Sequence, residues 1–215
     1  MKSAIIVFPG SNRERDMVMA LEATSGKSPF LVWHGEAELP QIDLIVIPGG
    51  FSYGDYLRAG CMAAHSPIIR EVKTRAEMGV HVLGICNGFQ ILCEAGLLPG
   101  ALIRNNCLEF RCMSVDLAVE NSTSEFNRDI LGARLCLPIA HGEGNYRIDA
   151  EGMAEIEANN QVLFRYSEPS GNPNGAMGDI AGIRNRAGNV FGMMPHPERA
   201  VEKFHPSSDG IKVLK

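Results

Sequence analysis

The segment that most constrains the fold is residues 80–96, where an apolar run passes through a tight turn into a helical pattern. The run at 80–85 leads into Gly-Ile-Cys-Asn-Gly at 84–88, and apolar residues then recur at helical spacing up to Gly96. A continuously apolar strand followed by a helix is typical of a parallel sheet that is covered on both faces. The segment therefore predicts one strand–turn–helix unit of an α/β sheet, with Cys86 at the turn.

The rest of the first hundred residues repeats this alternation. Apolar strands are predicted at 3–8, 29–34 and 44–47, and helices at about 12–23, with Asn12 as the cap, and at 62–78. We therefore expect an open, mostly parallel, flavodoxin-like α/β sheet with helices on both faces. Strand candidates at 112–119, 134–140, 162–166, 180–185 and 190–194 predict an antiparallel extension of this sheet. No linker or repeat divides the chain, so we expect a single domain over residues 1–215.

Composition excludes several classes of function. The net charge is −5 and no run of Lys and Arg exceeds two residues, so a nucleic-acid partner is not indicated. No apolar run approaches the length of a membrane span, and no signal peptide is recognisable, so we expect no membrane association and a cytoplasmic location. The six cysteines form no Cys-x-x-Cys pair, which predicts no metal site.

Cys86 is the candidate nucleophile. The flanking glycines permit a sharp turn, which lifts a side chain out of the carboxyl edge of the sheet. The helix that follows directs its positive end at the sulfur and favours the thiolate. A buried structural cysteine on a tight turn is the alternative, and the strand–turn–helix context favours the nucleophile.

A cysteine nucleophile needs a base, and His196 is the preferred one. It follows an apolar strand in Met-Met-Pro-His-Pro-Glu at 193–198. Residues two apart in an extended chain face the same side, so Glu198 is predicted to lie beside His196 and orient its imidazole. His141, in Ala-His-Gly-Glu-Gly at 140–144, is the competing base, and it could instead line an interface or a tunnel.

Donors for an oxyanion are predicted at a neighbouring strand end. Pro-Gly-Gly-Phe at 48–51 follows the strand at 44–47, so a backbone N–H at Gly50 could point at a bound carbonyl. The backbone N–H of Asn87, directly after the nucleophile, would supply the second donor. An ordinary glycine turn is the alternative for this segment.

These motifs resemble those of class I, triad-type glutamine amidotransferases. The resemblance rests on Gly-Ile-Cys-Asn-Gly-Phe-Gln at 84–90, Pro-Gly-Gly at 48–50 and His-Pro-Glu at 196–198, in the family's order of cysteine, histidine and glutamate. Within the family, the segments at 8–12, 50–60, 139–144 and 194–199 resemble the glutaminase subunits of phosphoribosylformylglycinamidine synthases. The similarity extends over nearly the whole chain.

The resemblance implies a function in purine biosynthesis. Cys86 would attack the side-chain amide of glutamine, with His196 as proton shuttle and Glu198 as its orienting acid. The substrate side of the site would include Gly50, Phe51, Asn87 and Gln90. Ammonia would pass to a separate synthetase subunit that binds ATP and Mg²⁺ and makes formylglycinamidine ribonucleotide, with a small third subunit in the complex. No phosphate-binding loop is recognisable, so no cofactor is expected in this chain.

The loop at 54–60, which contains Arg58, is predicted to face the synthetase or to gate the glutamine pocket, the alternative being a solvated loop. Three other functions stay open at this point. The chain could be a glutaminase of another pathway, or a peptidase or hydrolase with the same turn. It could also be a non-catalytic, flavodoxin-like module in which Cys86 senses oxidation.

Overall fold

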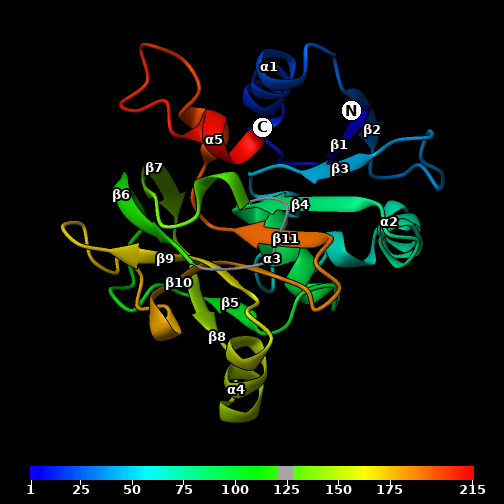
Figure 1. The fold of residues 1–215 in the computed structure, drawn as a ribbon. Coiled ribbons are helices and arrows are strands. Elements are labelled where there is room, and N and C mark those ends of the chain that lie inside the picture. The colour runs from blue at the N-terminus through cyan, green and yellow to red at the C-terminus, as the bar shows by residue number, and fades with distance from the viewer. Residues whose placement is uncertain (121–127) are drawn as a thin grey trace.

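One half of the main sheet is parallel. The computed structural model describes residues 1–120 and 128–215. Its parallel strands lie in the order β2-β1-β3-β4-β11 (Figure 1). Their bounds are β1 (Ser3–Val7), β2 (Phe30–Trp33), β3 (Leu44–Ile47), β4 (His81–Ile85) and β11 (Val190–Met193). This is the strand order of flavodoxin-like sheets, so the predicted fold class is confirmed.

The other half of the sheet is antiparallel and continues from β11 in the order β10-β9-β6-β7. Its strands are β10 (Ile180–Arg184), β9 (Val162–Ser167), β6 (Arg111–Val119) and β7 (Arg134–His141). The sequence assigned 190–194 to this extension alone, which is wrong. β11 is antiparallel to β10 but parallel to β4, because this wholly buried strand occupies the centre of the sheet.

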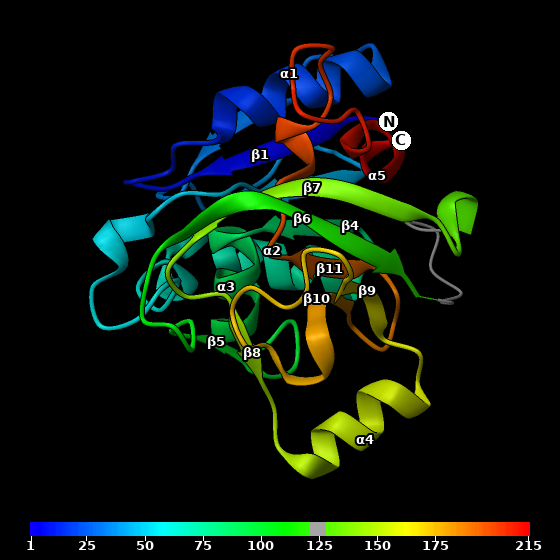
Figure 2. The ribbon, with the colours of Figure 1, turned by 90° about the vertical axis from the view of Figure 1, so that its left-hand side faces the viewer.

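Helices cover both faces of the parallel half. The helices α1 (Glu14–Ser25) and α5 (Gly210–Leu214) lie on one face, and α2 (Pro67–Glu77) and α3 (Asn87–Glu94) lie on the other (Figure 2). Strands β3 and β11 are therefore buried along their whole length, which explains their continuously apolar sequences. None of the helices in the described part of the chain combines the length and hydropathy that a bilayer crossing requires.

Two helix predictions differ from the structure in their bounds. The residue before α1 is Arg13, and Asn12 instead uses its backbone N–H to bond the carbonyl of Gly49, at 3.4 Å. The helix predicted at 62–78 is two elements, a 3-10 turn at Ala63–His65 and then α2. Pro67 separates them because proline lacks a backbone N–H and suits the first position of a helix.

Two β-strands and one α-helix were not predicted. The short strands β5 (Ala101–Ile103) and β8 (Asn145–Arg147) pair with each other beside the main sheet, and α4 (Ala150–Ala158) follows them. Helix α4 projects from the antiparallel half (Figure 1) and buries only Ile156 fully, so its apolar periodicity is weak. Its one local signal is Asp149, whose side chain caps the helix by accepting the Gly152 N–H at 2.7 Å.

Candidate active site

The turn between β4 and α3 has the geometry of a nucleophile elbow. Cys86 alone separates the two elements, with φ 52° and ψ −106°. Positive φ is uncommon for a residue with a side chain, and surrounding packing must enforce it. A Cβ at Gly84 would lie 2.7 Å from the backbone of Gly88, and a Cβ at Gly88 would overlap the carbonyl oxygen of Ile47. Both glycines are therefore required by the close approach of α3 to the sheet.

The elbow places Cys86 at the carboxyl edge of the parallel strands, where open α/β sheets bind ligands. Its side chain is nearly buried, and Sγ lies 3.8 Å from the carbonyl oxygen of Ala140 in β7. Strand β7 thus reaches over the nucleophile from the far half of the sheet. The backbone N–H of His196 also bonds β7, at the carbonyl of Pro138, at 2.8 Å. This antiparallel cover could not be inferred from local sequence.

His196 and Glu198 form a buried pair directly after β11. Nδ1 of His196 lies 2.6 Å from Oε1 of Glu198, and both residues are at most 3% exposed. The predicted contact is present, but the predicted extended backbone is wrong. Pro197–Arg199 forms a 3-10 turn, and this turn brings the carboxylate back to the imidazole.

Charge around His196 favours its protonated form. Burial lowers the pKa of His196, but the carboxylate of Glu198 and the Cys86 sulfur outweigh burial and raise it above its usual value. Nε2 is buried and has no hydrogen-bond partner among the described residues. With Nδ1 on Glu198, Nε2 is the nitrogen that remains for exchanging a proton with the thiol or a substrate.

His141 is placed differently from His196. It is 2% exposed, and its Nε2 lies 3.1 Å from the side-chain nitrogen of Asn174. The Asn174 oxygen accepts the Ala176 N–H, so its nitrogen is the donor to His141. Burial and then the nearby His196 lower the pKa of His141 to about 3. A neutral imidazole whose Nε2 already accepts a bond is a poor base, so the structure favours His196 as the base. A role of His141 at an interface or a tunnel stays a prediction.

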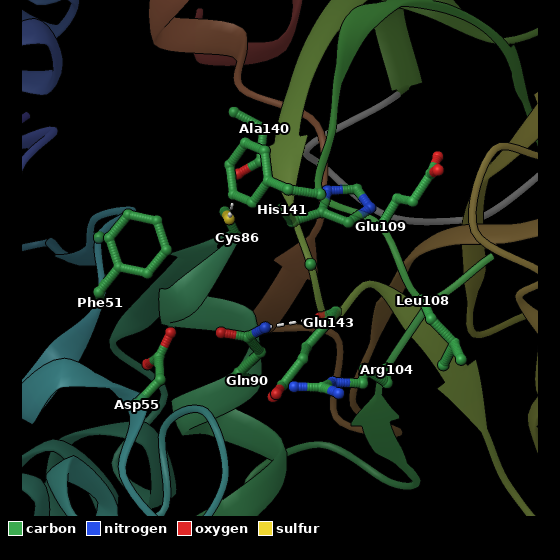
Figure 3. Close-up of a pocket in the computed structure, with 13 residues that line it drawn as sticks. Phe51, Asp55, Cys86, Gln90, Arg104, Leu108, Glu109, Ala140, His141 and Glu143 are labelled. Atoms are coloured by element: carbon green, nitrogen blue, oxygen red, sulfur yellow. Dashed lines mark hydrogen bonds between the residues drawn. The ribbon is translucent and has the colours of Figure 1, made fainter. Parts of the chain in front are cut away.

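A pocket of about 310 Å³ opens beside the nucleophile. Figure 3 shows Cys86 at one end of it and Gln90 one helical turn further along α3. The sequence predicted several of its lining residues, namely Gly50, Phe51, Cys86, Gln90 and His141. Four charged residues in the lining were not predicted, namely Asp55, Arg104, Glu109 and Glu143. Two of these, Asp55 and Glu143, lie within the segments that carried the family resemblance.

The oxyanion segment after β3 is packed tightly. A Cβ at Gly50 would lie 2.7 Å from the carbonyl oxygen of Gly10, so only glycine fits there. The Gly50 N–H has no acceptor among the described residues, whereas the Phe51 N–H is bonded to Gly10 at 2.9 Å. The N–H of Asn87 is at the first position of α3, where helices leave their N–H groups without an internal acceptor. Gly50 and Asn87 therefore remain the candidate donors, and Phe51 contributes its side chain.

Side-chain amides tie this segment to the helix of the nucleophile. Oδ1 of Asn87 accepts the Ser52 N–H at 3.0 Å, and its nitrogen donates to Asp55 at 3.2 Å and to Gln90 at 2.9 Å. Gln90 in turn donates to the carbonyl of Glu143 at 2.6 Å. These bonds hold Gln90 against the pocket wall.

Arg58 lies outside the pocket. Its guanidinium makes two bonds to Glu94 near the end of α3, at 2.7 and 2.6 Å, and the Arg58 side chain is 60% exposed. The neighbouring side chains of Tyr56 and Leu57 are also strongly exposed. The loop therefore presents an apolar surface beside the pocket.

Fold and site together place a buried cysteine, histidine and glutamate at the ends of two adjacent parallel strands of a flavodoxin-like sheet. Residues 1–210 match the family model of the CobB/CobQ-like glutamine amidotransferase domain. The chain therefore belongs to this family of glutamine amidotransferases.

Within this family, the chain is closely similar in sequence to one kind of glutamine amidotransferase subunit. The chain is 56% identical over 211 residues to the phosphoribosylformylglycinamidine synthase subunit PurQ of Rhizobium meliloti, covering 98% of this chain and 94% of that protein. It is 53% identical over 221 residues to PurQ of Moorella thermoacetica, covering 100% and 94%. It also superposes on a chain of the PurLQS structure from Thermotoga maritima with a TM-score of 0.88 and 45% identity, covering 99% and 95%. A more distant glutamine amidotransferase of that organism, at 17% identity and a TM-score of 0.64, shares the fold.

Proposed function

We propose that this chain is the glutaminase subunit of a phosphoribosylformylglycinamidine synthase in purine biosynthesis. The buried Cys86, His196 and Glu198 at the ends of adjacent parallel strands are the observation that carries the proposal. The identity with PurQ proteins over nearly the full chain supports the pathway.

The reaction follows from the positions of these groups. The Cys86 thiolate attacks the side-chain carbonyl carbon of glutamine, and backbone N–H groups of Gly50 and Asn87 stabilise the oxyanion. The protonated His196 gives its proton to the leaving nitrogen, so ammonia departs and a glutamyl thioester remains. His196 then takes a proton from water, which attacks the thioester, and collapse of the intermediate releases glutamate and regenerates the Cys86 thiolate beside protonated His196. Glu198 holds the imidazole in the required tautomer throughout.

We further propose that the ammonia is used by a separate synthetase subunit, together with a small third subunit. The chain's similarity to a component of the PurLQS structure supports this assembly. ATP and Mg²⁺ would bind to the synthetase, where ATP activates formylglycinamide ribonucleotide, and this chain would need no cofactor. All six cysteines are free thiols, which fits the reducing cytoplasm as its location.

The test is glutamate release from glutamine, with and without the synthetase subunits, ATP and formylglycinamide ribonucleotide. We expect stimulation by these partners and its disappearance in Cys86→Ala, whereas the exposed Cys112→Ala keeps activity. Stimulation that survives Cys86→Ala would exclude the proposed nucleophile. Stimulation by a different synthetase would retain the chemistry and change the pathway.

The exposed loop that contains Arg58 is the proposed contact with the synthetase or gate of the pocket. The Arg58 side of its pair with Glu94 is 60% exposed, so Arg58→Ala should change the free energy of unfolding by only about 0.2–1 kcal/mol. We expect the variant to alter glutamate release in the complex. Unchanged release both alone and in the complex would contradict a role for this loop.

A further inference from the structure

The pocket beside Cys86 has a charged wall that the hydrolysis of an amide does not itself require. Asp55 and Glu143 line it on either side of Gln90, and Arg104 lies on the Glu143 side (Figure 3). None of these three charged groups takes part in attack, proton transfer or oxyanion stabilisation as described above. Asp55 lies at about the level of Gln90, and Glu143 and Arg104 lie at the end of the pocket away from the nucleophile (Figure 3).

The backbone at Asp55 has a strained conformation. Its φ is 53°, and the nearby Tyr53 and Leu57 also have positive φ values, of 54° and 69°. Non-glycine residues in this conformation are strained and persist only where surrounding structure enforces them. Here the enforcing bonds are those from Asn87 to Asp55 at 3.2 Å and from the Tyr53 hydroxyl to His34 at 2.9 Å. The strain therefore serves to fix a carboxylate at the pocket wall.

The two carboxylates lack a cation. Burial and then the charge of Glu143 raise the pKa of Asp55 to about 6, so Asp55 is still ionised at neutral pH. Oε2 of Glu143 accepts only a backbone N–H, from Ala59 at 3.2 Å. No Lys or Arg in the described residues lies within ion-pair distance of either carboxylate. A positive group between them would satisfy both, and a primary ammonium has three N–H donors to do so.

The dimensions suit an amino-acid substrate. Gln90 is one helical turn, about 5.4 Å, beyond Cys86 along α3. Three carbon–carbon bonds of about 1.5 Å separate the amide carbon of glutamine from its α-carbon, so the α-groups reach this level. Arg104 has no ion-pair partner among the described residues, and its guanidinium is available to an α-carboxylate. Both charges of a free amino acid thus meet groups of opposite sign.

We propose that Asp55, assisted by Glu143, binds the α-ammonium group of glutamine and makes the enzyme selective for the free amino acid. This inference rests on the proposed function, whose nucleophile occupies the same pocket. Asp55 is a specificity-determining residue in this proposal and performs no chemical step. Peptide-bound glutamine and amides without an α-ammonium group would lose this contact.

The test compares L-glutamine with 4-carbamoylbutanoate, which has the same amide but no amino group. Glutamate or glutarate release is measured with the full chain and its synthetase subunits. Asp55→Asn keeps the shape, the bond to Asn87 and a residue type that tolerates positive φ. We expect kcat/KM for glutamine to fall by about 10- to 100-fold, as for loss of a charge-assisted hydrogen bond, with little change for 4-carbamoylbutanoate. The exposed Glu151→Gln serves as the control and should change neither.

An equal fall in kcat/KM for both substrates in Asp55→Asn would show that Asp55 has a structural role and would overturn the proposal. An unchanged preference of this variant for glutamine over 4-carbamoylbutanoate would overturn it too. A binding measurement separates this result from the proposed function. Calorimetry of L-glutamine with Cys86→Ala should show about 10- to 100-fold weaker binding when Asp55→Asn is added. If the wild type binds glutamine in this Asp55-dependent way but never hydrolyses it, the proposed function fails and the ammonium site stands. If hydrolysis is normal and binding ignores Asp55, the ammonium site fails alone.

Discussion

The buried His141 should make the stability of this protein sensitive to mild acid. Its imidazole is 2% exposed, its Nε2 accepts a bond from Asn174, and its pKa is lowered to about 3, first by burial and then by His196. In the unfolded chain the pKa of the same imidazole is the ordinary histidine value of 6.5. Between these two pKa values the unfolded state binds a proton that the folded state excludes.

The sign and size of the effect follow from this difference. Stability must fall as the pH falls below 6.5, because protons then favour the unfolded state. Each pKa unit corresponds to about 1.36 kcal/mol, so going from pH 7.5 to 5.0 should remove about 2 kcal/mol through this one group. Well above pH 6.5, His141 is neutral in both states, and the free energy of unfolding carries no penalty from its protonation.

The perturbation is His141→Gln, which can still accept the Asn174 bond but does not titrate. Urea unfolding at pH 7.5, 6.5, 5.5 and 5.0 gives the free energy of unfolding of the variant and the wild type. We expect the wild type to lose about 2 kcal/mol more than the variant between pH 7.5 and 5.0. Other titrating groups, including Asp55, are common to both proteins and cancel in the comparison. His65→Gln, at an exposed position, should follow the wild type. Parallel curves for wild type and His141→Gln would refute the reasoning.

Two further predictions concern the partner of His196 and the glycine after the Cys86 turn. The carboxylate of Glu198 orients His196 and raises the pKa of its imidazole, and Glu198→Gln removes this charge. We therefore expect kcat/KM for glutamine to fall about 10²-fold or more. An undiminished rate of glutamate release would exclude Glu198 from the triad. The added methyl group of Gly88→Ala would overlap the Ile47 carbonyl, so this variant should lower the free energy of unfolding in urea by about 1–3 kcal/mol or more. The control is Gly35→Ala, whose methyl group would have its nearest neighbour at 3.4 Å and should leave the free energy of unfolding nearly unchanged. Equal stabilities of these two variants would contradict the packing argument.

Local patterns located the first four strands of the parallel half of the sheet, β1 to β4, but not the place of β11. The apolar run Leu44–Ile47 was located with its observed bounds because burial on both faces leaves no polar position in the strand. The two glycines around Cys86 were informative for a similar reason, since a sharp turn under a helix excludes side chains at those positions. The His196–Glu198 contact was also predicted, but from an extended backbone, whereas a 3-10 turn produces it.

Elements stabilised by distant partners were missed or misplaced. Strands β5 and β8 have three residues each and depend on pairing with one another, so neither has a pattern of its own. Helix α4 buries too little apolar surface to show periodicity. β11 has the composition of any buried strand, and only the packing of the whole sheet determines that it lies beside β4.

The sequence by itself determined the type of fold and the three residues proposed for the chemistry, because these depend on short motifs and on strand ends that meet at one edge. Only the tertiary structure decided which histidine carries charge, since burial and neighbours favour the protonated form of His196 and the neutral form of His141. It also decided that β7 covers the nucleophile and that Asp55 and Glu143 share a pocket wall. Electrostatic environment is set by groups far apart in the chain, so it exists only once the chain has folded.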